Sequence, residues 1–258
     1  MPELPEVEIN KQYFDLTSLN KEITDVLVRD DRILELEAEE FKELIIGNKF
    51  KSTIRYGKYL FVELDSFYML LHFGMSGDLK YFEKMDDEPK YSKIIFHFKN
   101  GYYLSYISIR LFGSVEIVKD VNDFIKKKKL GPDAFKMTKD EFLQATKRRN
   151  GMMKNLLLNQ EFVAGVGNVY SDEILFRSSV SPKRKITDLN EKEIDMIFKQ
   201  IKEVLKFGIN KRGDWTSYPE DSLIPHRKNN SNCPSCGEHL SIMEASGRRG
   251  FYCSKCQI

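Results

Sequence analysis

The sequence predicts an α+β protein with one N-terminal helix, an antiparallel β-sandwich or barrel, a helical region and a small terminal metal-binding module. Three observations lead to this prediction. Short runs of β-branched and aromatic residues fill the chain up to about residue 120. Helix-capping patterns follow these runs. All four cysteines fall within the last 26 residues.

Composition limits the class of protein. The chain has 258 residues, of which 41% are hydrophobic, so it can form one large core or two medium ones. It contains no apolar run of about 18 residues and no secretory pattern, so we expect a cytoplasmic protein without membrane contact. The formal net charge of +2 identifies no partner. Local basic patches, at residues 147–149 and in the last 33 residues, are compatible with nucleic-acid binding.

The N-terminal stretch Met1–Glu6 reads MPELPE and is open to two interpretations. Residues 4–19 carry apolar side chains at helical spacing, so Pro2 and Glu3 fit the start of a helix. Alternatively, removal of Met1 turns Pro2 into a secondary amine, which can attack a sugar or carbonyl carbon and form an iminium adduct. The Glu3 carboxyl group then stands beside this amine as a proton donor.

Seven runs between residues 22 and 119 have the composition of β-strands. Asn100-Gly101 separates two of them and indicates a two-residue hairpin turn. The runs are Glu22–Val28, Lys49–Tyr56, Tyr59–Asp65, Tyr68–Phe73, Ser92–Lys99, Tyr102–Ile107 and Gly113–Lys119.

Helix signals dominate after about residue 120. Thr138 and Glu141 form a capping box that opens a helix over residues 141–148. Asn190 and Glu193 open another helix, which we expect to end at about residue 207, before Gly208. The polar residues 209–232 link these helices to the terminal module.

The cysteines form two Cys-x-x-Cys pairs, Cys233 with Cys236 and Cys253 with Cys256, with 16 residues between the pairs. This spacing is typical of a tetrahedral structural zinc site. Disulfides are the alternative, but a chain without a secretory signal is expected in a reducing compartment. Four thiolates leave no open coordination position, so the metal would hold structure and do no chemistry.

Two turns offer contacts for anions. The apolar turn Val163–Tyr170 contains two glycines and presents backbone amides at a helix start. It is not a dinucleotide-binding turn, because no third glycine, preceding strand or βαβ unit accompanies it. Residues 246–252 look like a hairpin with Arg248 and Arg249 near its tip. These arginines suit phosphate contacts or insertion into a duplex, although a solvated turn explains them equally well.

Together these motifs resemble the formamidopyrimidine-DNA glycosylase/endonuclease VIII family of DNA repair enzymes, over nearly the whole chain. The N-terminal stretch, the Val163–Tyr170 turn and the four-cysteine finger occur in the family's order. The implied architecture is an N-terminal β-sandwich domain (residues 1–120), a helix–two-turns–helix domain (121–225) and a zinc finger (226–258). The implied partner is damaged double-stranded DNA, bound by a monomer between the two main domains.

The resemblance implies a bifunctional glycosylase and AP lyase of base excision repair. Pro2 would attack the anomeric carbon of the damaged nucleotide, and Glu3 would protonate the ring oxygen of the sugar. The iminium would then drive elimination of the phosphates on both sides. The implied substrates are formamidopyrimidines and 8-oxoguanine, whose extrusion from the stack costs about a few kcal/mol.

The resemblance also assigns roles outside the N-terminus. Lys58 matches a lysine that binds a phosphate near the lesion, although a solvated turn lysine is the ordinary alternative. His72 has a structural histidine as its alternative, and Met75 and Phe112 have core packing as theirs. The implied DNA contacts are His72, Lys154, Asn168, His226 and Arg248. The implied wedge that fills the place of the extruded base consists of Met75, Arg110 and Phe112.

The chain departs from the family pattern in three places. Residues 108–113 read SIRLFG where formamidopyrimidine-type members usually carry DPRRFG, which leaves the choice of opposite base open. The segment between Phe207 and Cys233 is short for a lid over oxidised purines, which suggests hydantoins and oxidised pyrimidines as further substrates. His226 stands where many relatives have a tyrosine.

Two other functions compete with this one. A non-catalytic damaged-DNA-binding paralogue would keep the finger and the cleft, but the joint presence of Pro2, Glu3 and Lys58 disfavours it. A zinc-finger regulator that reads sequence is disfavoured because the chain has no obvious recognition helix with base-reading side chains.

Overall fold

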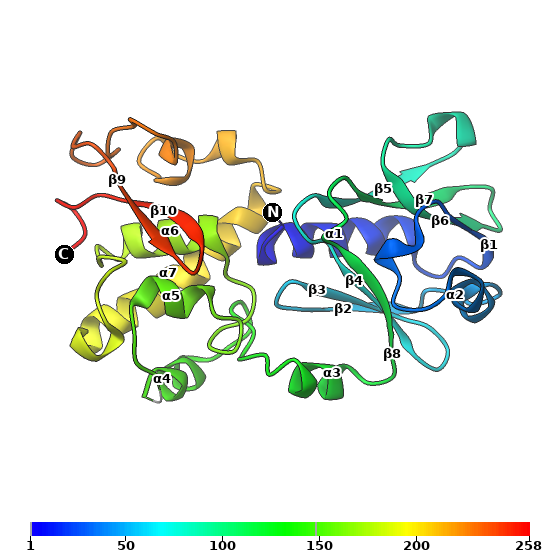
Figure 1. Ribbon diagram of the computed structural model, residues 1–258, viewed down its shortest axis with the longest axis horizontal. Coiled ribbons are helices and arrows are strands. Elements are labelled where there is room, and N and C mark those ends of the chain that lie inside the picture. The colour runs from blue at the N-terminus through cyan, green and yellow to red at the C-terminus, as the bar shows by residue number, and fades with distance from the viewer. Residues whose placement is uncertain (1, 148) are drawn as a thin grey trace. The chain divides into compact units, whose positions relative to one another are not determined.

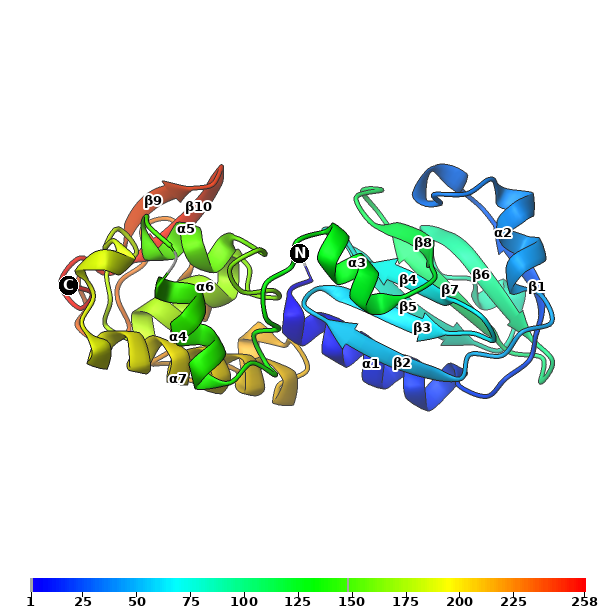
Figure 2. The same cartoon turned by 90° about the horizontal axis from the view of Figure 1, so that it is seen from below.

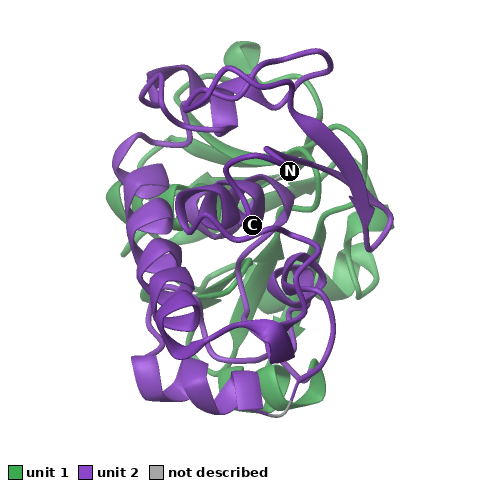
Figure 3. Ribbon diagram, turned by 90° about the vertical axis from the view of Figure 1, so that its left-hand side faces the viewer, with its two compact units in different colours: residues 1–2, 6–128 green, residues 3–5, 129–258 purple. Residues whose placement is uncertain are grey.

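The computed structural model describes residues 2–147 and 149–258, which form two compact units (Figure 3). Unit 1 comprises Pro2 and residues 6–128, and unit 2 comprises residues 3–5 and 129–258. The short stretch Glu3–Pro5 therefore packs with the second half of the chain, although it stands at the beginning. Within the described residues, no helix combines the length and apolar character that crossing a membrane requires.

The predicted fold class is confirmed, because an N-terminal helix and antiparallel sheets precede a helical unit with a four-cysteine cluster. The helices are α1 (Leu4–Ser18), α2 (Ala38–Ile45), α3 (Val121–Lys127), α4 (Lys139–Lys147), α5 (Met153–Leu158), α6 (Asn168–Arg177) and α7 (Glu191–Asn210). The strands are β1 (Ile23–Val28), β2 (Ser52–Tyr56), β3 (Tyr59–Glu63), β4 (Tyr68–His72), β5 (Gly77–Phe82), β6 (Ser92–Phe98), β7 (Tyr103–Ser108), β8 (Ser114–Val118), β9 (Ser241–Ala245) and β10 (Arg248–Tyr252).

Unit 1 is a sandwich of two four-stranded antiparallel sheets, with strand orders β1-β6-β7-β5 and β2-β3-β4-β8 (Figure 1). Helix α1 runs alongside the sandwich in both views (Figures 1 and 2). The Tyr13 hydroxyl of α1 accepts a hydrogen bond from the backbone N–H of Tyr81 in β5, and Asp15 accepts one from the Thr53 hydroxyl in β2. Since β5 and β2 are edge strands, α1 joins the two sheets along one side and covers edges that would otherwise be exposed.

The core of unit 1 lies between the sheets and α1. The buried ring of Phe50 contacts Phe14 of α1 edge-on at 5.0 Å between centroids and Phe96 of β6 at 5.4 Å. Aromatic pairs in this geometry add to the free energy gained from area burial. The α1 helix that begins just after Pro2 is therefore anchored in the core of the sandwich.

Each strand predicted from the sequence is present, with ends shifted by up to three residues. The predicted two-residue turn at Asn100-Gly101 is wrong. The N–H of Phe98 donates to the Tyr102 carbonyl (2.9 Å), so the loop has three residues, and Gly101 takes the left-handed conformation (φ +87°) that closes it. Strand β5 and helices α2, α3 and α5 were not predicted. The three helices have eight, seven and six residues, so each spans about two turns and leaves little periodicity to recognise.

Unit 2 is built around α6, which packs against α5, α7 and β10 (Figure 1). The capping box of Thr138 and Glu141 is confirmed by reciprocal hydrogen bonds at the start of α4, whose predicted end at Arg148 lies outside the described residues. The predicted end of α7 before Gly208 is wrong, since the helix continues to Asn210. Gly208 serves close packing instead, because a Cβ there would lie 2.7 Å from the Tyr170 ring.

Candidate active site and DNA interface

The Glu3 carboxylate lies against the start of α6. It accepts hydrogen bonds from the backbone N–H groups of Val169 (2.9 Å) and Tyr170 (3.4 Å), and the residue is only 1% exposed. The first amides of a helix have no intrahelical partner and carry the positive end of its dipole. The N-cap residue, Gly167, has no side chain to satisfy them. The anion that occupies the predicted amide site is therefore Glu3 of the same chain.

Two glycines make room for the N-terminal segment. A Cβ on Gly167 would lie 2.3 Å from Cδ of Glu3, and a Cβ on Gly165 would lie 2.5 Å from Cδ1 of Leu4. Gly165 also has φ +116°, which L side chains rarely adopt, and its carbonyl accepts the Leu4 N–H at 3.1 Å. The apolar turn 163–170 therefore requires glycine at both positions because of residues far away in the sequence.

Pro2 is half-buried and directly precedes Glu3 and α1. Both interpretations of the N-terminus are compatible with this position of Pro2. Pro2 leads into a helix, and the next residue, Glu3, is the one whose carboxylate is hydrogen-bonded to the α6 amides. Met1, whose removal would free the Pro2 nitrogen, lies outside the described residues.

In unit 1, Lys58 and His72 share one end of the sheet β2-β3-β4-β8. Lys58 lies in the turn between β2 and β3, and His72 is the last residue of β4. Tyr59 pairs with His72 across the two strands, with ring centroids 5.1 Å apart. Burial lowers the pKa of His72 below its ordinary value, and the positive charge of Lys58 lowers it further, against an opposing effect of Glu116. The imidazole is therefore neutral near pH 7.

A buried arginine holds the turn that carries Lys58. The Arg55 guanidinium donates to the Glu8 carboxylate of α1 (2.6 Å) and to the Gly57 carbonyl (3.2 Å). Its side chain is almost fully buried, so the pair is protected from screening by solvent. This contact ties the helix that follows Pro2 to the Lys58 turn.

The three predicted wedge residues lie on two neighbouring loops of unit 1. A Cβ on Gly74 would lie 2.3 Å from the Phe112 carbonyl carbon, and the Arg110 N–H donates to the Ser76 hydroxyl (3.2 Å), so the loops touch along their backbones. Met75 is 41% exposed and Phe112 is 62% exposed, which rules out core packing for both. The Arg110 guanidinium is 3.9 Å from the Met75 sulfur.

Lys154 does not have the position expected of a DNA contact. Its side chain is fully buried. Its ammonium group donates to the Asn168 carbonyl (2.9 Å), the Ser171 hydroxyl (2.7 Å) and the Asp172 carboxylate (2.6 Å). An ammonium has three donors, and all three have acceptors inside unit 2. The structure thus places this ammonium group in a hydrogen-bond network internal to unit 2.

The other three predicted DNA contacts all belong to unit 2: Asn168, His226 and Arg248. Asn168 is the first residue of α6, and its amide donates to the Arg249 carbonyl (2.8 Å), which leaves one further N–H on the same group. Arg248 is exposed at the start of β10, directly after the hairpin turn. His226 is half-buried, and its Nε2 lies 3.1 Å from the Glu220 carbonyl oxygen.

One residue at this site, Asp172, was not predicted. Asp172 accepts hydrogen bonds from Lys154, from Arg227 (2.8 Å) and from the backbone N–H of Phe251 (3.1 Å). The only sequence signal was an acidic pair, Asp172-Glu173, inside an otherwise apolar helix. Such groups are rarely buried without partners.

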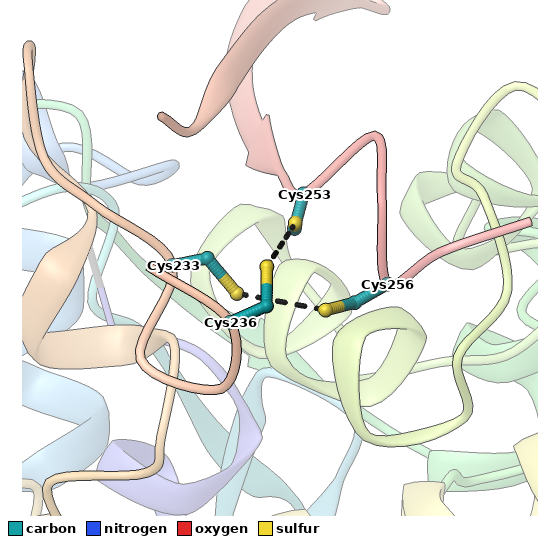
Figure 4. Close-up of side chains that lie close together, drawn as sticks. All are labelled: Cys233, Cys236, Cys253 and Cys256. Carbon is teal, nitrogen blue, oxygen red and sulfur yellow. Dashed lines mark hydrogen bonds between the residues drawn. The ribbon is translucent and has the colours of Figure 1, made fainter. Parts of the chain in front are cut away.

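The four cysteines converge (Figure 4). Sulfur–sulfur distances are 3.8 Å between Cys233 and Cys256 and 3.5 Å between Cys236 and Cys253, and all four sulfurs lie within 4.8 Å of one another. Ligands about 2.3 Å from a tetrahedral zinc ion would be about 3.8 Å apart, whereas a disulfide requires about 2.05 Å. The donor set therefore fits one metal ion, and the disulfide alternative is wrong.

The family model described as the formamidopyrimidine-DNA glycosylase N-terminal domain matches residues 1–115, and that described as the H2TH domain matches residues 130–219. A formamidopyrimidine-DNA glycosylase of Pelotomaculum thermopropionicum is 33% identical, and the alignment covers 100% of this chain and 99% of the relative. One of Listeria monocytogenes is 30% identical with both chains covered completely. The chain belongs to the formamidopyrimidine-DNA glycosylase family.

Solved structures agree with this membership. Lactococcus lactis Fpg in complex with abasic-site-containing DNA is similar with a TM-score of 0.88 and 26% identity, over 99% of both chains. A complex of the LlFpg protein with THF-DNA and an inhibitor has a TM-score of 0.89 and 25% identity, over 100% of both chains. The protein is thus a DNA glycosylase of base excision repair, from a family with glycosylase and AP lyase activity.

Substitution of Gly167 by alanine should disable this formamidopyrimidine-DNA glycosylase family enzyme. The added Cβ would displace the Glu3 carboxylate from the α6 amides. A displacement of about 1 Å can reduce a rate about 100-fold, and we expect at least that loss in single-turnover cleavage of an abasic-site duplex. Glu161→Ala, at an exposed position in the preceding turn, is the matched control. A wild-type rate in Gly167→Ala would show that cleavage does not depend on the contact between the Glu3 carboxylate and the α6 amides.

The His72 imidazole of this glycosylase should titrate below its ordinary pKa of about 6.5, and Lys58→Gln should raise that pKa by removing a nearby positive charge. Because the unfolded chain binds this proton more readily, the stability contributed by neutral His72 is lost as pH falls below about 6.5. NMR titration of the four histidines measures both values. Lys49→Gln is the control for a general charge effect. An unchanged His72 pKa in Lys58→Gln would exclude proximity between Lys58 and His72.

Proposed function

We propose that this enzyme excises oxidised purines by forming an iminium between Pro2 and the C1′ atom of the damaged nucleotide. The Pro2 amine attacks C1′, the glycosidic bond breaks, and the base leaves with a proton. The C1′–O4′ bond then opens as O4′ takes a proton, which leaves an iminium that acidifies the C2′ position. Loss of a C2′ proton expels the 3′ phosphate, and a second elimination expels the 5′ phosphate.

The observation that carries this proposal is the position of the Glu3 carboxyl group at the start of α6. Its carboxyl group is buried, is fixed by the Val169 and Tyr170 amides, and is adjacent in sequence to the Pro2 nitrogen. A proton donor at a fixed position beside the nucleophile is what ring opening at O4′ requires. Glu3 is therefore the proposed acid, and Pro2 without Met1 is the proposed nucleophile.

The proposed DNA contacts follow the charge and exposure of the described residues. Lys58 and His72, at one end of a sheet in unit 1, would bind a phosphate near the lesion. Asn168 and Arg248 in unit 2 would bind the phosphates beside the extruded nucleotide, with His226 as a further contact. Such contacts position the duplex, and those made by the cationic Lys58 and Arg248 would carry the salt-dependent part of the affinity.

The exposed loop residues Met75, Arg110 and Phe112 form the proposed wedge. Apolar side chains inserted between bases offset the cost of unstacking, which is about a few kcal/mol per step. The Arg110 guanidinium has donors for the edge of the orphaned base. The exposure of all three side chains supports this role.

The proposed substrates are formamidopyrimidines and 8-oxoguanine. Solved relatives include Lactococcus lactis Fpg with FAPY-dG-containing DNA and MutM with DNA containing carbocyclic 8-oxo-G. The short segment between α7 and the finger supports hydantoins and oxidised pyrimidines as additional substrates. We further propose that the enzyme acts as a monomer and that Cys233, Cys236, Cys253 and Cys256 bind one structural Zn²⁺ ion.

Borohydride trapping tests the nucleophile. The wild-type enzyme with Met1 removed should form a covalent adduct with a duplex containing one 8-oxoguanine, because borohydride reduces the iminium to a stable amine. The same chain with two extra N-terminal residues should form none, since its Pro2 nitrogen is an amide. Denaturing electrophoresis and intact mass measure the adduct and the state of the N-terminus.

Two outcomes would contradict this proposal. An adduct of equal yield from the extended chain would place the nucleophile elsewhere. Tight lesion binding without an adduct on any member of a panel of oxidised bases would favour the alternative, a non-catalytic damaged-DNA-binding paralogue.

Removal of zinc should separate DNA binding from the fold of unit 1. The finger is small and depends on its metal, so chelation should unfold it. We expect at least a tenfold rise in the Kd for an abasic-site duplex, while the far-ultraviolet circular dichroism of the sandwich is retained. Metal analysis before and after chelation, and restoration with one equivalent of Zn²⁺, are the controls. Unchanged affinity after complete zinc loss would contradict this role.

A further inference from the structure

Helix α6 holds the finger strand β10 at two points. The Asn168 amide donates to the Arg249 carbonyl (2.8 Å), and the Asp172 carboxylate accepts the Phe251 N–H (3.1 Å). Asn168 and Asp172 are four residues apart and lie on one face of the helix. The two backbone groups are two residues apart and lie on one edge of the strand. The finger is thus docked by side chains of α6 along an edge of β10.

The Asp172 carboxylate also joins two cations. One oxygen accepts from the Lys154 ammonium (2.6 Å), and the other accepts from the Arg227 guanidinium (2.8 Å). Both cations also reach the Asn168 carbonyl oxygen, at 2.9 Å and 3.5 Å. Asp172 is 1% exposed at its side chain, so its charge interacts with both partners in a poorly solvated setting.

The strand has little freedom to move against this network. A Cβ on Gly250 would lie 3.0 Å from the Asp172 oxygen and 3.3 Å from Cε of Lys154. The Arg227 guanidinium also lies 5.6 Å from the centroid of the Phe251 ring. Contacts from α5, α6 and the segment before the finger therefore fix β10 on several sides.

We propose that Asp172 is a positioning residue for DNA binding, which sets the place of Arg248 relative to Asn168. Arg248 begins the strand whose Phe251 N–H Asp172 holds. Without the carboxylate charge, the Lys154 and Arg227 cations would lie close together with no anion between them. The single oxygen of an asparagine amide could not accept from both cations and from the Phe251 N–H as the two carboxylate oxygens do. This inference rests on the proposed phosphate contacts of Asn168 and Arg248.

The test compares Asp172→Asn with Glu173→Gln. Glu173 is the next residue of α6 and is also buried. Its carboxylate pairs with Arg177 (2.6 Å) and accepts the Ile224 N–H (2.8 Å), and among the described residues it has no hydrogen bond or ion pair with β10. Both substitutions remove one buried negative charge from the same helix. A purely structural effect would therefore be common to both variants.

We expect Asp172→Asn to raise the Kd for an abasic-analogue duplex at least tenfold. The slope of log Kd against log salt should fall by about one, the value for one lost phosphate contact. The single-turnover rate at saturating enzyme should stay within about threefold of wild type, with one zinc per chain. Glu173→Gln should lower the melting temperature without changing the salt slope.

Several results would overturn the proposal. One is an unchanged Kd and salt slope in folded Asp172→Asn, and another is an equal change in Glu173→Gln. If Asp172→Asn does not fold, Gly250→Ala is the second variant, because its added Cβ should shift β10 without removing a charge. A wild-type salt slope in Gly250→Ala would also overturn the proposal. Asn168→Ala and Arg248→Ala test the underlying contacts separately: if neither changes the Kd, the proposed phosphate contacts fail, whatever Asp172 does.

Discussion

The contact between the Glu3 carboxylate and the first turn of α6 is the constraint on which the arrangement of the site depends. It connects the third residue of the chain to amides that lie more than 160 positions later. Since Pro2 is bonded to Glu3, the position of the N-terminus follows from the position of α6. The glycines at 165 and 167 exist in this turn because the contact leaves no space for side chains.

Helix α6 is unusual in that its buried surface includes polar residues as well as apolar ones. Ser171, Asp172 and Glu173 are consecutive and buried, and each bonds to a different part of unit 2. Buried polar groups cost free energy unless they are paired, so such a helix tolerates few alternative packings. These buried polar residues therefore hold the finger and the segment before it in one specific position.

Local patterns in the sequence predicted what depends on neighbouring residues. The capping boxes at Thr138 and Asn190, the strands and the cysteine cluster all belong to this class. The burial of Lys154 could not be predicted, because its partners come from α6 and no pattern within α5 distinguishes it from an exposed lysine. The continuation of α7 through Gly208 depends in the same way on a ring from another helix.

The division of the chain into units has a consequence for its synthesis on the ribosome. Residues 3–5 belong to unit 2, whereas the chain from residue 6 to residue 128 forms unit 1. At about 5–20 residues per second, the amides that hold Glu3 emerge roughly 10–30 s after Glu3 itself. The nascent sandwich can therefore form before the Glu3 carboxylate reaches the α6 amides, so this contact is among the last parts of the site to form.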